Sequence, residues 1–307
     1  MKSLDLSQSP QEVMHHYGKS FYFASMVFSK PTAVKVFSLY QFCRYVDDCG
    51  DELDPIDGQK RLNTLVEIID GKISEPTNLY KLVTNILDSG VKPQDLKILI
   101  NGALYEAKGH HVSSKQDLIH YCYLVAGVVG KMMCPLIGVK KTNAEPYSID
   151  MGIGMQLTNI CRDVLEDHEN DRYYLWELEP KFKYTSTSDS GALDTEENRA
   201  IVLKYLDLAD VYYKSAFRGL SYIPFRSRVA IFVASEIYRA IGKKIRKSKN
   251  KVFYQRIYLN TFEKFWVCFK SSLKILHPAF WKSKTHESDL HIELKESLKL
   301  PVSEVLR

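Results

Sequence analysis

One stretch of the chain, residues 152–175, limits the possible folds more than any other. Its central part, residues 155–169, contains no proline or glycine and therefore reads as a helix. On a helix, side chains four positions apart share a face, with Cβ atoms roughly 5–6 Å apart. The stretch thus predicts one polar helix face, formed by Gln156, Asn159, Asp163 and Asp167.

A second stretch, residues 40–52, repeats this arrangement of carboxylates. Asp47 and Asp51 are again four positions apart, and Asp48 and Glu52 add negative charge. Clustered carboxylates repel one another unless a cation neutralises them, and Mg²⁺ prefers oxygen ligands, including carboxylates and substrate phosphates. The two stretches therefore predict one shared cation site that binds a diphosphate.

Two other interpretations fit parts of this pattern. Either stretch alone could be a solvated, charged helix end, and a pair of carboxylates could act as general acid and base. Several carboxylates in two i, i+4 pairs, with amides on the same face, fit metal binding better. The basic residues near the two stretches, which could neutralise phosphate charge, are Lys19, Arg44, Arg162 and Arg172.

Helical periodicity covers most of the remaining chain, and no segment shows the alternation of a strand, so we expect an all-α protein. The segments that read as further helices are 31–52, 59–70, 79–89, 93–108, 198–220 and 226–247. One domain is expected over residues 13–265. We expect a flexible N-terminus at 1–12, and at 266–307 a basic and aromatic tail of unknown role.

The composition restricts the partners and the location. A net charge of +5 suits an anionic substrate or membrane surface, but no nucleic-acid motif accompanies it, so no nucleic-acid partner is expected. The chain has no long uncharged apolar run, and its N-terminus lacks the apolar core of a signal peptide. We therefore expect a cytoplasmic protein without a transmembrane helix.

Cofactor motifs other than the acidic stretches are weak. The six cysteines form no CxxC pair and no zinc spacing with histidine, so no structural zinc site is indicated. Gly152 and Gly154 lack the third glycine and the preceding strand of a dinucleotide fingerprint. The use of NADPH stays open.

The chain from residue 243 onward combines basic and aromatic side chains. It reads KKIRKSKNK over 243–251, and seven aromatic residues follow between 253 and 269. Such a segment can lie in a membrane interface. The alternative is a terminal helix with a solvated basic face, and the sequence leaves both open, together with the oligomeric state.

Two acidic motifs occur in a specific order, LYQFCRYVDDCGDE at 39–52 and QLTNICRDVLEDHENDRYYL at 156–175. HHYGKSF at 15–21 precedes them, and YCYLVAGVVG at 121–130 lies between them. With these motifs the chain resembles the squalene/phytoene synthase family, the head-to-head prenyltransferases, over roughly residues 14–264. The resemblance implies an isoprenoid synthase fold, a single helical bundle around a central cavity.

The resemblance also implies the reaction, in which a Mg²⁺-dependent enzyme joins two prenyl diphosphates through a cyclopropyl diphosphate that ionises again and rearranges. Mn²⁺ could replace Mg²⁺. Two C15 substrates would give a squalene or presqualene type product, and two C20 substrates would give phytoene. The alternatives are a terpene cyclase-like enzyme acting on one diphosphate and a non-catalytic prenyl-binding assembly subunit.

The matched motifs imply a role for individual residues. Tyr121 would line the reaction centre together with Gln156 and Asn159, and aromatic faces there would stabilise a carbocation without attacking it. The residues that would hold the cation are Asp47, Asp48, Asp51, Asn159, Asp163 and Asp167. The residues that would contact the substrate are Lys19, Ser20, Phe21, Tyr40, Arg44, Arg172, Tyr174 and Arg256.

Overall fold

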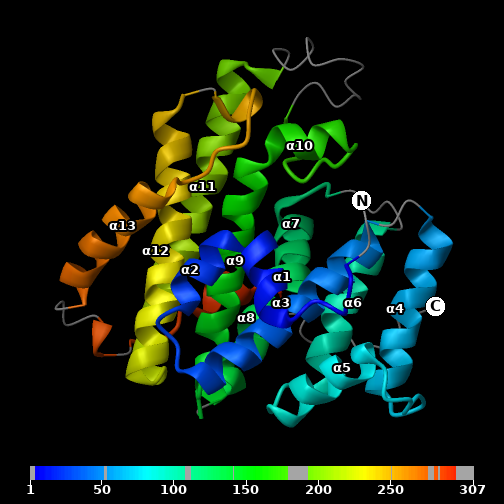
Figure 1. Ribbon diagram of the computed structural model, residues 1–307. Coiled ribbons are helices and arrows are strands. Elements are labelled where there is room, and N and C mark those ends of the chain that lie inside the picture. Colours follow the sequence, from blue (N-terminus) through cyan, green and yellow to red (C-terminus); the bar gives the residue numbers. More distant parts are fainter. Residues whose placement is uncertain are drawn as a thin grey trace.

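The computed structural model describes residues 4–51, 54–107, 112–140, 142–178, 193–249, 251–275, 280–282 and 284–294. Within these ranges the chain is a bundle of helices without a strand, which confirms the all-α prediction (Figure 1). The first helices are α1 Pro10–Tyr17, α2 Lys19–Ser25, α3 Lys30–Gly50, α4 Pro55–Ile69, α5 Asn78–Asp88, α6 Pro93–Ala107 and α7 Lys115–Cys122. A π-helix, Tyr123–Gly127, follows, and then come α8 Val128–Leu136, α9 Glu145–Arg162, α10 Val164–Glu169, α11 Glu196–Phe217, α12 Phe225–Lys247 and α13 Thr261–Lys274.

Helix α9 occupies the centre of the bundle. It packs against α8, α11 and α12, and these helices surround it in the ribbon view (Figure 1). Two glycines allow α8 and α9 to approach closely. A Cβ atom on Gly130 would lie 2.0 Å from the Ser148 carbonyl oxygen, and one on Gly152 would lie 2.1 Å from the Ala126 carbonyl oxygen. Gly130, in the motif at 121–130, and Gly152 therefore serve helix packing.

One helical stretch of the described residues is long and apolar enough to cross a membrane. It runs over Lys115–Leu136 and joins α7, the π-helix and α8. Half of its most apolar window is buried inside the molecule, and its segments pack against α6 and α9. Its apolar character is accounted for by this position in the core of the bundle.

The stretch 155–169, predicted to be one helix, is divided at Asp163. Helix α9 ends at Arg162, Asp163 adopts φ −101° and ψ 15°, and α10 begins at the next residue. The Asp167 amide still donates to the Asp163 carbonyl oxygen at 2.8 Å, so the two aspartates keep their helical spacing. The prediction of an uninterrupted helix is thus wrong, while the spacing of the two carboxylates is retained.

Both chain ends are packed more closely than we expected. Ser9 and Glu12 form a capping box at the start of α1, and Leu4 is buried in the core below α3. The described part of segment 1–12 is therefore ordered against the bundle. At the other end, the expected boundary at 265/266 falls inside α13, and Phe280 and Leu294 are buried.

Candidate active site

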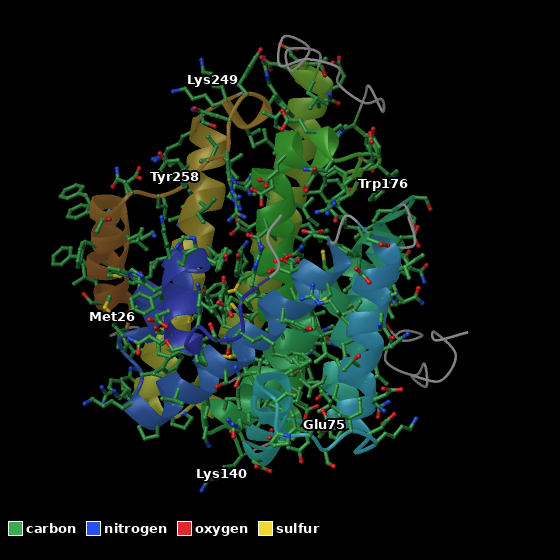
Figure 2. The ribbon with its side chains drawn as sticks, turned by 45° about the vertical axis from the view of Figure 1, so that its right-hand side comes forward. Met26, Glu75, Lys140, Trp176, Lys249 and Tyr258 are labelled. Carbon is green, nitrogen blue, oxygen red and sulfur yellow. The ribbon has the colours of Figure 1, made fainter. Side chains whose placement is uncertain are left out.

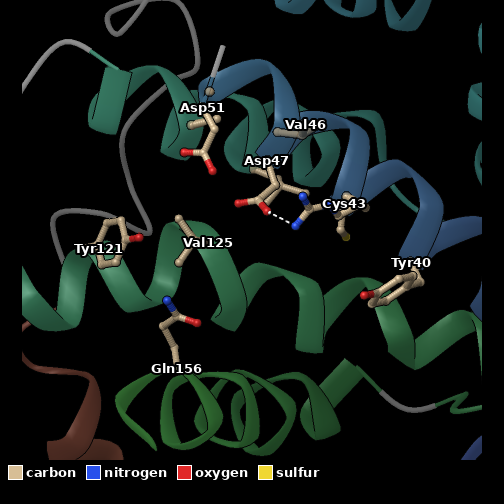
Figure 3. A pocket seen from close by; sticks show the side chains of 12 residues that line it. Tyr40, Cys43, Val46, Asp47, Asp51, Tyr121, Val125 and Gln156 are labelled. Carbon is tan, nitrogen blue, oxygen red and sulfur yellow. Dashed lines mark hydrogen bonds and ion pairs between the residues drawn. The ribbon is translucent and has the colours of Figure 1, made fainter. Parts of the chain in front are cut away.

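A pocket of about 220 Å³ opens beside the carboxyl end of α3. Asp47 and Asp51 point from α3 toward the side where Tyr121 and Gln156 lie (Figure 3). We call this space the polar pocket. Its lining residues are Tyr40, Cys43, Arg44, Val46, Asp47, Gly50, Asp51, Leu99, Ala103, Tyr121, Val125 and Gln156.

A second space, the apolar cavity, has a volume of about 300 Å³. It shares Tyr40, Cys43, Val125 and Gln156 with the polar pocket, so the two spaces adjoin. Most of its wall is apolar, and it extends between α2, α3, α8, α9 and α12 to the region of Tyr147. An elongated apolar chain with a charged head group fits these two adjoining spaces.

The two acidic stretches meet through an ion pair. The Arg172 guanidinium donates to the Asp51 carboxylate across a separation of 121 residues in the chain. This contact joins the segment after α10 to the end of α3. The structure therefore brings together the two stretches that the sequence predicted to share one cation site.

Arg44 pairs with the adjacent Asp47 and Asp48 of the first stretch, and these two carboxylates face different environments. Its Nη1 is 3.0 Å from Asp47 Oδ2, and its Nη2 is 2.5 Å from Asp48 Oδ1. Asp47 is exposed and lines the polar pocket, whereas Asp48 is buried and accepts a hydrogen bond from the Leu4 amide. Burial raises the pKa of the Asp48 carboxyl above its usual value. Because Asp48 is buried against Leu4 and Arg44, outside the lining of the polar pocket, the structure does not present it to the predicted cation site.

The second stretch presents Asp163 to two arginines. Arg162 donates to it from Nε at 2.8 Å and from Nη2 at 2.5 Å, and Arg256 Nε lies 3.0 Å away. Arg256 also pairs with Glu166 at 3.1 Å. Asp167 lies one turn further along, on α10. Arg256 thus faces the second acidic stretch, and its contact with the substrate stays a prediction.

Asn159 carries a buried oxygen that is available to a ligand. Its Nδ2 donates to Gln156 Oε1 at 3.2 Å, while its Oδ1 is buried without a hydrogen-bond partner. Both side chains line the apolar cavity. An unsatisfied buried carbonyl oxygen is costly, and it is the kind of oxygen that Mg²⁺ or Mn²⁺ binds. The residues at this position therefore fit a hard divalent cation.

Aromatic rings contribute to both spaces: Tyr40 lines both of them, Tyr121 lines the polar pocket and Phe21 lines the apolar cavity. Tyr121 and Tyr174 stack with ring centroids 4.6 Å apart, and their hydroxyl groups are 3.0 Å apart. Phe21 lies 6.4 Å from the Tyr40 ring and 5.0 Å from the Tyr238 ring. Burial raises the pKa of both Tyr40 and Tyr238, so both remain neutral phenols at ordinary pH.

The predicted residues of α2 divide between two environments. Phe21 lines the apolar cavity, whereas Lys19 is exposed at the start of α2 and lines neither space, and neither does Ser20. Burial and the positive charge of Lys19 lower the pKa of Lys264. The sequence did not predict that Lys264 of α13 and Tyr238 of α12 lie near α2, because no local pattern relates these helices to α2.

The helical bundle has an isoprenoid synthase fold. Its polar pocket and adjoining apolar cavity form a site for a substrate with a charged head group and an apolar chain. Residues 14–263 match the squalene/phytoene synthase family, and the chain belongs to that family of prenyltransferases. Its relatives include two enzymes of carotenoid biosynthesis. The 15-cis-phytoene synthase of Paracoccus sp. is 32% identical over 271 residues, which are 82% of this chain and 86% of that enzyme. The 15-cis-phytoene synthase of Enterobacter agglomerans is 30% identical over 264 residues, 80% and 88% of the two chains.

Solved structures agree on the fold. A dehydrosqualene synthase in complex with a ligand superposes with a TM-score of 0.72 at 24% identity, covering 87% of this chain and 95% of that one. Squalene synthase HpnC from Alicyclobacillus acidocaldarius gives a TM-score of 0.63 at 21% identity, with coverages of 80% and 97%. These similarities confirm the predicted isoprenoid synthase fold.

Proposed function

We propose that this enzyme joins two molecules of geranylgeranyl diphosphate head to head and produces phytoene. The observation that carries this proposal is the ion pair between Asp51 and Arg172, which unites both acidic stretches at the polar end of an apolar cavity. The C20 substrate is favoured over the C15 substrate because the relatives at 30–32% identity are phytoene synthases. The squalene and dehydrosqualene synthases are similar below 25% identity and support the fold alone.

The diphosphates occupy the polar pocket in this proposal. The ligands of Mg²⁺ or Mn²⁺ would be Asp47 and Asp51 of the polar pocket and the Asn159 Oδ1 that lacks a partner. They would be joined by Asp163 and Asp167, which line neither space but belong to the stretch that Arg172 connects to Asp51. The bound cation would neutralise the leaving diphosphate. Three arginines pair with these carboxylates, namely Arg44, Arg172 and Arg256. When a cation binds the carboxylates, the guanidinium groups would become free to bind phosphate oxygens.

The prenyl chains occupy the apolar cavity, which excludes water from the carbocations. Tyr121, Tyr40 and Phe21 present ring faces that stabilise positive charge. The first diphosphate leaves, C1 of that chain bonds to the second chain, and loss of a proton closes a cyclopropane. The second diphosphate then leaves, and rearrangement with loss of a second proton gives phytoene.

Product analysis tests this proposal directly. The purified protein is incubated with Mg²⁺ and either farnesyl or geranylgeranyl diphosphate, with and without NADPH, and extracted lipids are analysed by mass. The expected result is a C40 hydrocarbon from the C20 substrate without NADPH. A C30 product would overturn the choice of chain length, and a cyclised product of one diphosphate would indicate a terpene cyclase. Binding of substrate without turnover would indicate an assembly subunit.

We also propose that α13 docks on a membrane containing anionic lipid. Five large apolar side chains of this helix, each more than half exposed, follow one helical face, namely Phe262, Phe265, Trp266, Phe269 and Leu273. Tyr258 lies just before α13, and side chains of this helix project from the outer edge of the molecule (Figure 2). Glu263 is the one acidic residue between positions 243 and 274, where lysine and arginine are frequent. Aromatic residues beside basic residues match an anionic lipid surface.

The position of α13 also suits a lipid substrate. Phe265 contacts Phe23 on α2 with ring centroids 5.1 Å apart, and α2 contributes Phe21 and Ala24 to the apolar cavity. A membrane bound at α13 would therefore lie near the helix that lines the prenyl cavity. Co-sedimentation with phosphatidylcholine vesicles, with and without phosphatidylserine, tests this contact. W266S/F269S should bind the anionic vesicles at least about tenfold less, whereas I56S, which removes an even more exposed apolar residue from α4, should bind normally.

Equal binding of W266S/F269S and the wild-type chain to anionic vesicles would refute the membrane contact. Loss of self-association in that variant, without any vesicle binding by the wild-type chain, would instead identify the face as an interface between two copies. Both outcomes leave the condensation reaction unaffected, because none of the exposed residues lines either space.

A further inference from the structure

A second cluster of metal-ligating side chains lies away from the two acidic stretches. Asp150 of α9 is fully buried, and the two histidines His286 and His291 approach it from the C-terminal segment. His286 Nε2 is 2.8 Å from Asp150 Oδ2, and His291 Nε2 is 2.7 Å from Asp150 Oδ1. One ligand atom from each of the three residues lies within 4.8 Å of the other two. The two imidazoles thus contact the two oxygens of one carboxylate, and the three side chains form one compact cluster.

The charge of this cluster is unusual. A carboxylate shielded fully from water carries a large desolvation cost unless a cation compensates it. Among the described residues, the ion pairs of Asp150 are with His286 and His291 and with no lysine or arginine. A metal ion bound at this cluster would supply the positive charge that no lysine or arginine supplies here.

A third element contributes an unsatisfied oxygen. Ser215 of α11 is fully buried, and its hydroxyl faces the Asp150 carboxylate. No hydrogen bond of ordinary distance and angle satisfies Ser215 Oγ. A buried hydroxyl without a partner is costly, and an additional ligand or a bound water at this point would satisfy it.

We propose that Asp150, His286 and His291 bind a divalent transition-metal ion of the zinc class. Two imidazole nitrogens and one carboxylate oxygen are a donor set that suits Zn²⁺, and a fourth position is left for water or for Ser215 Oγ. Each histidine binds through Nε2 as the Nδ1–H tautomer. With metal–ligand bonds of about 2.0–2.2 Å, each nitrogen–oxygen separation widens from the present 2.7–2.8 Å to roughly 3.3 Å, an increase of about half an ångström.

This site is separate from the cation site of the proposed reaction. Asp163 follows Asp150 by thirteen positions, just past the end of α9, which corresponds to a rise of roughly 20 Å along the helix. Imidazole ligands favour Zn²⁺ over Mg²⁺, which prefers carboxylates, carbonyls and water. The zinc-class ion therefore has a structural role, since it ties the segment 284–294 to the central helix that also carries Gln156 and Asn159.

Metal analysis of the full-length protein tests the proposal. After equilibration with Zn²⁺ and removal of the free ion, we expect about one zinc per chain by mass spectrometry. H291A should retain little zinc, whereas H16A, which removes an exposed histidine of α1, should retain the wild-type content. Zinc should also raise the melting temperature of the wild-type chain by several degrees, and EDTA should reverse this rise.

A spectroscopic measurement keeps the test independent of variants that fail to fold. Titration of the wild-type chain with Co²⁺ should give visible ligand-field bands that saturate at one equivalent and disappear on addition of Zn²⁺. Wild-type protein that retains no zinc, shows no cobalt spectrum and melts at the same temperature with Zn²⁺ or EDTA would overturn the proposal. Full zinc retention by H291A would overturn it as well. Neither readout depends on prenyl diphosphate turnover, so failure here is distinct from failure of the proposed function.

Discussion

The Arg172 side chain reaches back over 121 residues of sequence to form an ion pair with Asp51 at the polar pocket. This contact links the end of α3 to the segment that follows α10 and defines one site from two distant motifs. In D51N the negative charge is lost while the shape is kept. We expect kcat/KM to fall roughly 100-fold or more and the Mg²⁺ requirement to rise. Steady-state kinetics over a range of Mg²⁺ concentrations, with melting temperature as the folding control, would check this. Unchanged turnover at limiting Mg²⁺ would exclude Asp51 from the site.

The adjacent aspartates of α3 should differ in their effect on catalysis. D47N removes a carboxylate that lines the polar pocket, whereas D48N changes a buried side chain that faces Leu4 and Arg44. We therefore expect D47N to lose at least about tenfold in kcat/KM and D48N to keep turnover close to the wild-type value. Parallel kinetics of the two variants distinguish the roles. A larger loss in D48N would show that the buried carboxylate moves into the pocket during the reaction.

Tyr147 should control the length of the accepted prenyl chain. It lines the apolar cavity, its hydroxyl donates to the Lys284 carbonyl oxygen at 2.6 Å, and His286 packs on its ring at 5.0 Å. Y147A should deepen the cavity and raise kcat/KM for a C25 diphosphate relative to the C20 diphosphate by roughly tenfold. Y147F keeps the ring and should leave this ratio unchanged, while losing about 1 kcal/mol of stability. Competition between the two substrates, with products resolved by mass, gives the ratio. An unchanged ratio in Y147A would place the end of the prenyl chain elsewhere.

Two glycines of α9 should respond differently to alanine. A Cβ atom on Gly152 would lie 2.1 Å from the Ala126 carbonyl oxygen, but one on Gly154 would lie 3.3 Å from its nearest neighbour, the Ala209 carbonyl oxygen. G152A should therefore lower the free energy of unfolding by about 3 kcal/mol, because two helix backbones must separate. G154A should change it by less than about 1 kcal/mol. Denaturant unfolding of both variants makes the comparison, and equal stabilities would contradict the close crossing of α9 and the π-helix Tyr123–Gly127.

His168 should make the protein less stable at mildly acidic pH. It is buried on α10, its Nδ1 lies 3.0 Å from the Val164 carbonyl oxygen, and burial lowers its pKa below the usual value. The unfolded chain therefore binds a proton near pH 6.5 that the folded chain excludes. The stability linked to His168 is fully present above pH 6.5 and is lost as the pH falls toward the lowered pKa, by up to about 1.4 kcal/mol per pH unit.

Denaturant unfolding at pH 7.5 and pH 5.5 measures this effect. The free energy of unfolding of the wild-type chain should fall more between these pH values than that of H168Q, which lacks the titrating group. Burial also lowers the pKa of His120. Comparing the pH dependence of the unfolding free energy in the wild-type chain and in H168Q separates the effect of His168 from that of His120. Parallel pH profiles would show that His168 is protonated in the folded chain.

The sequence alone determined the all-α class, most helix positions and the residues of both acidic stretches. These features are local, because a 3.6-residue repeat and a four-residue spacing depend on a few neighbouring positions. The same local information predicted that Gln156, Asn159, Asp163 and Asp167 share a polar face, and it predicted the aromatic and basic segment that α13 contains.

Tertiary structure decided what those faces meet. Asp47 and Asp48 are neighbours in sequence, yet one lines the pocket and the other is buried, because α3 rotates each Cβ by about 100° per residue toward a different partner. The break at Asp163 places α10 in a direction that helix propensity does not specify. Asp150, His286 and His291 converge across more than 130 positions of the chain, and no spacing rule relates them. Burial, cavity depth and such clusters depend on which distant segments pack together. Local patterns in the sequence do not reveal that packing, so only the folded structure shows it.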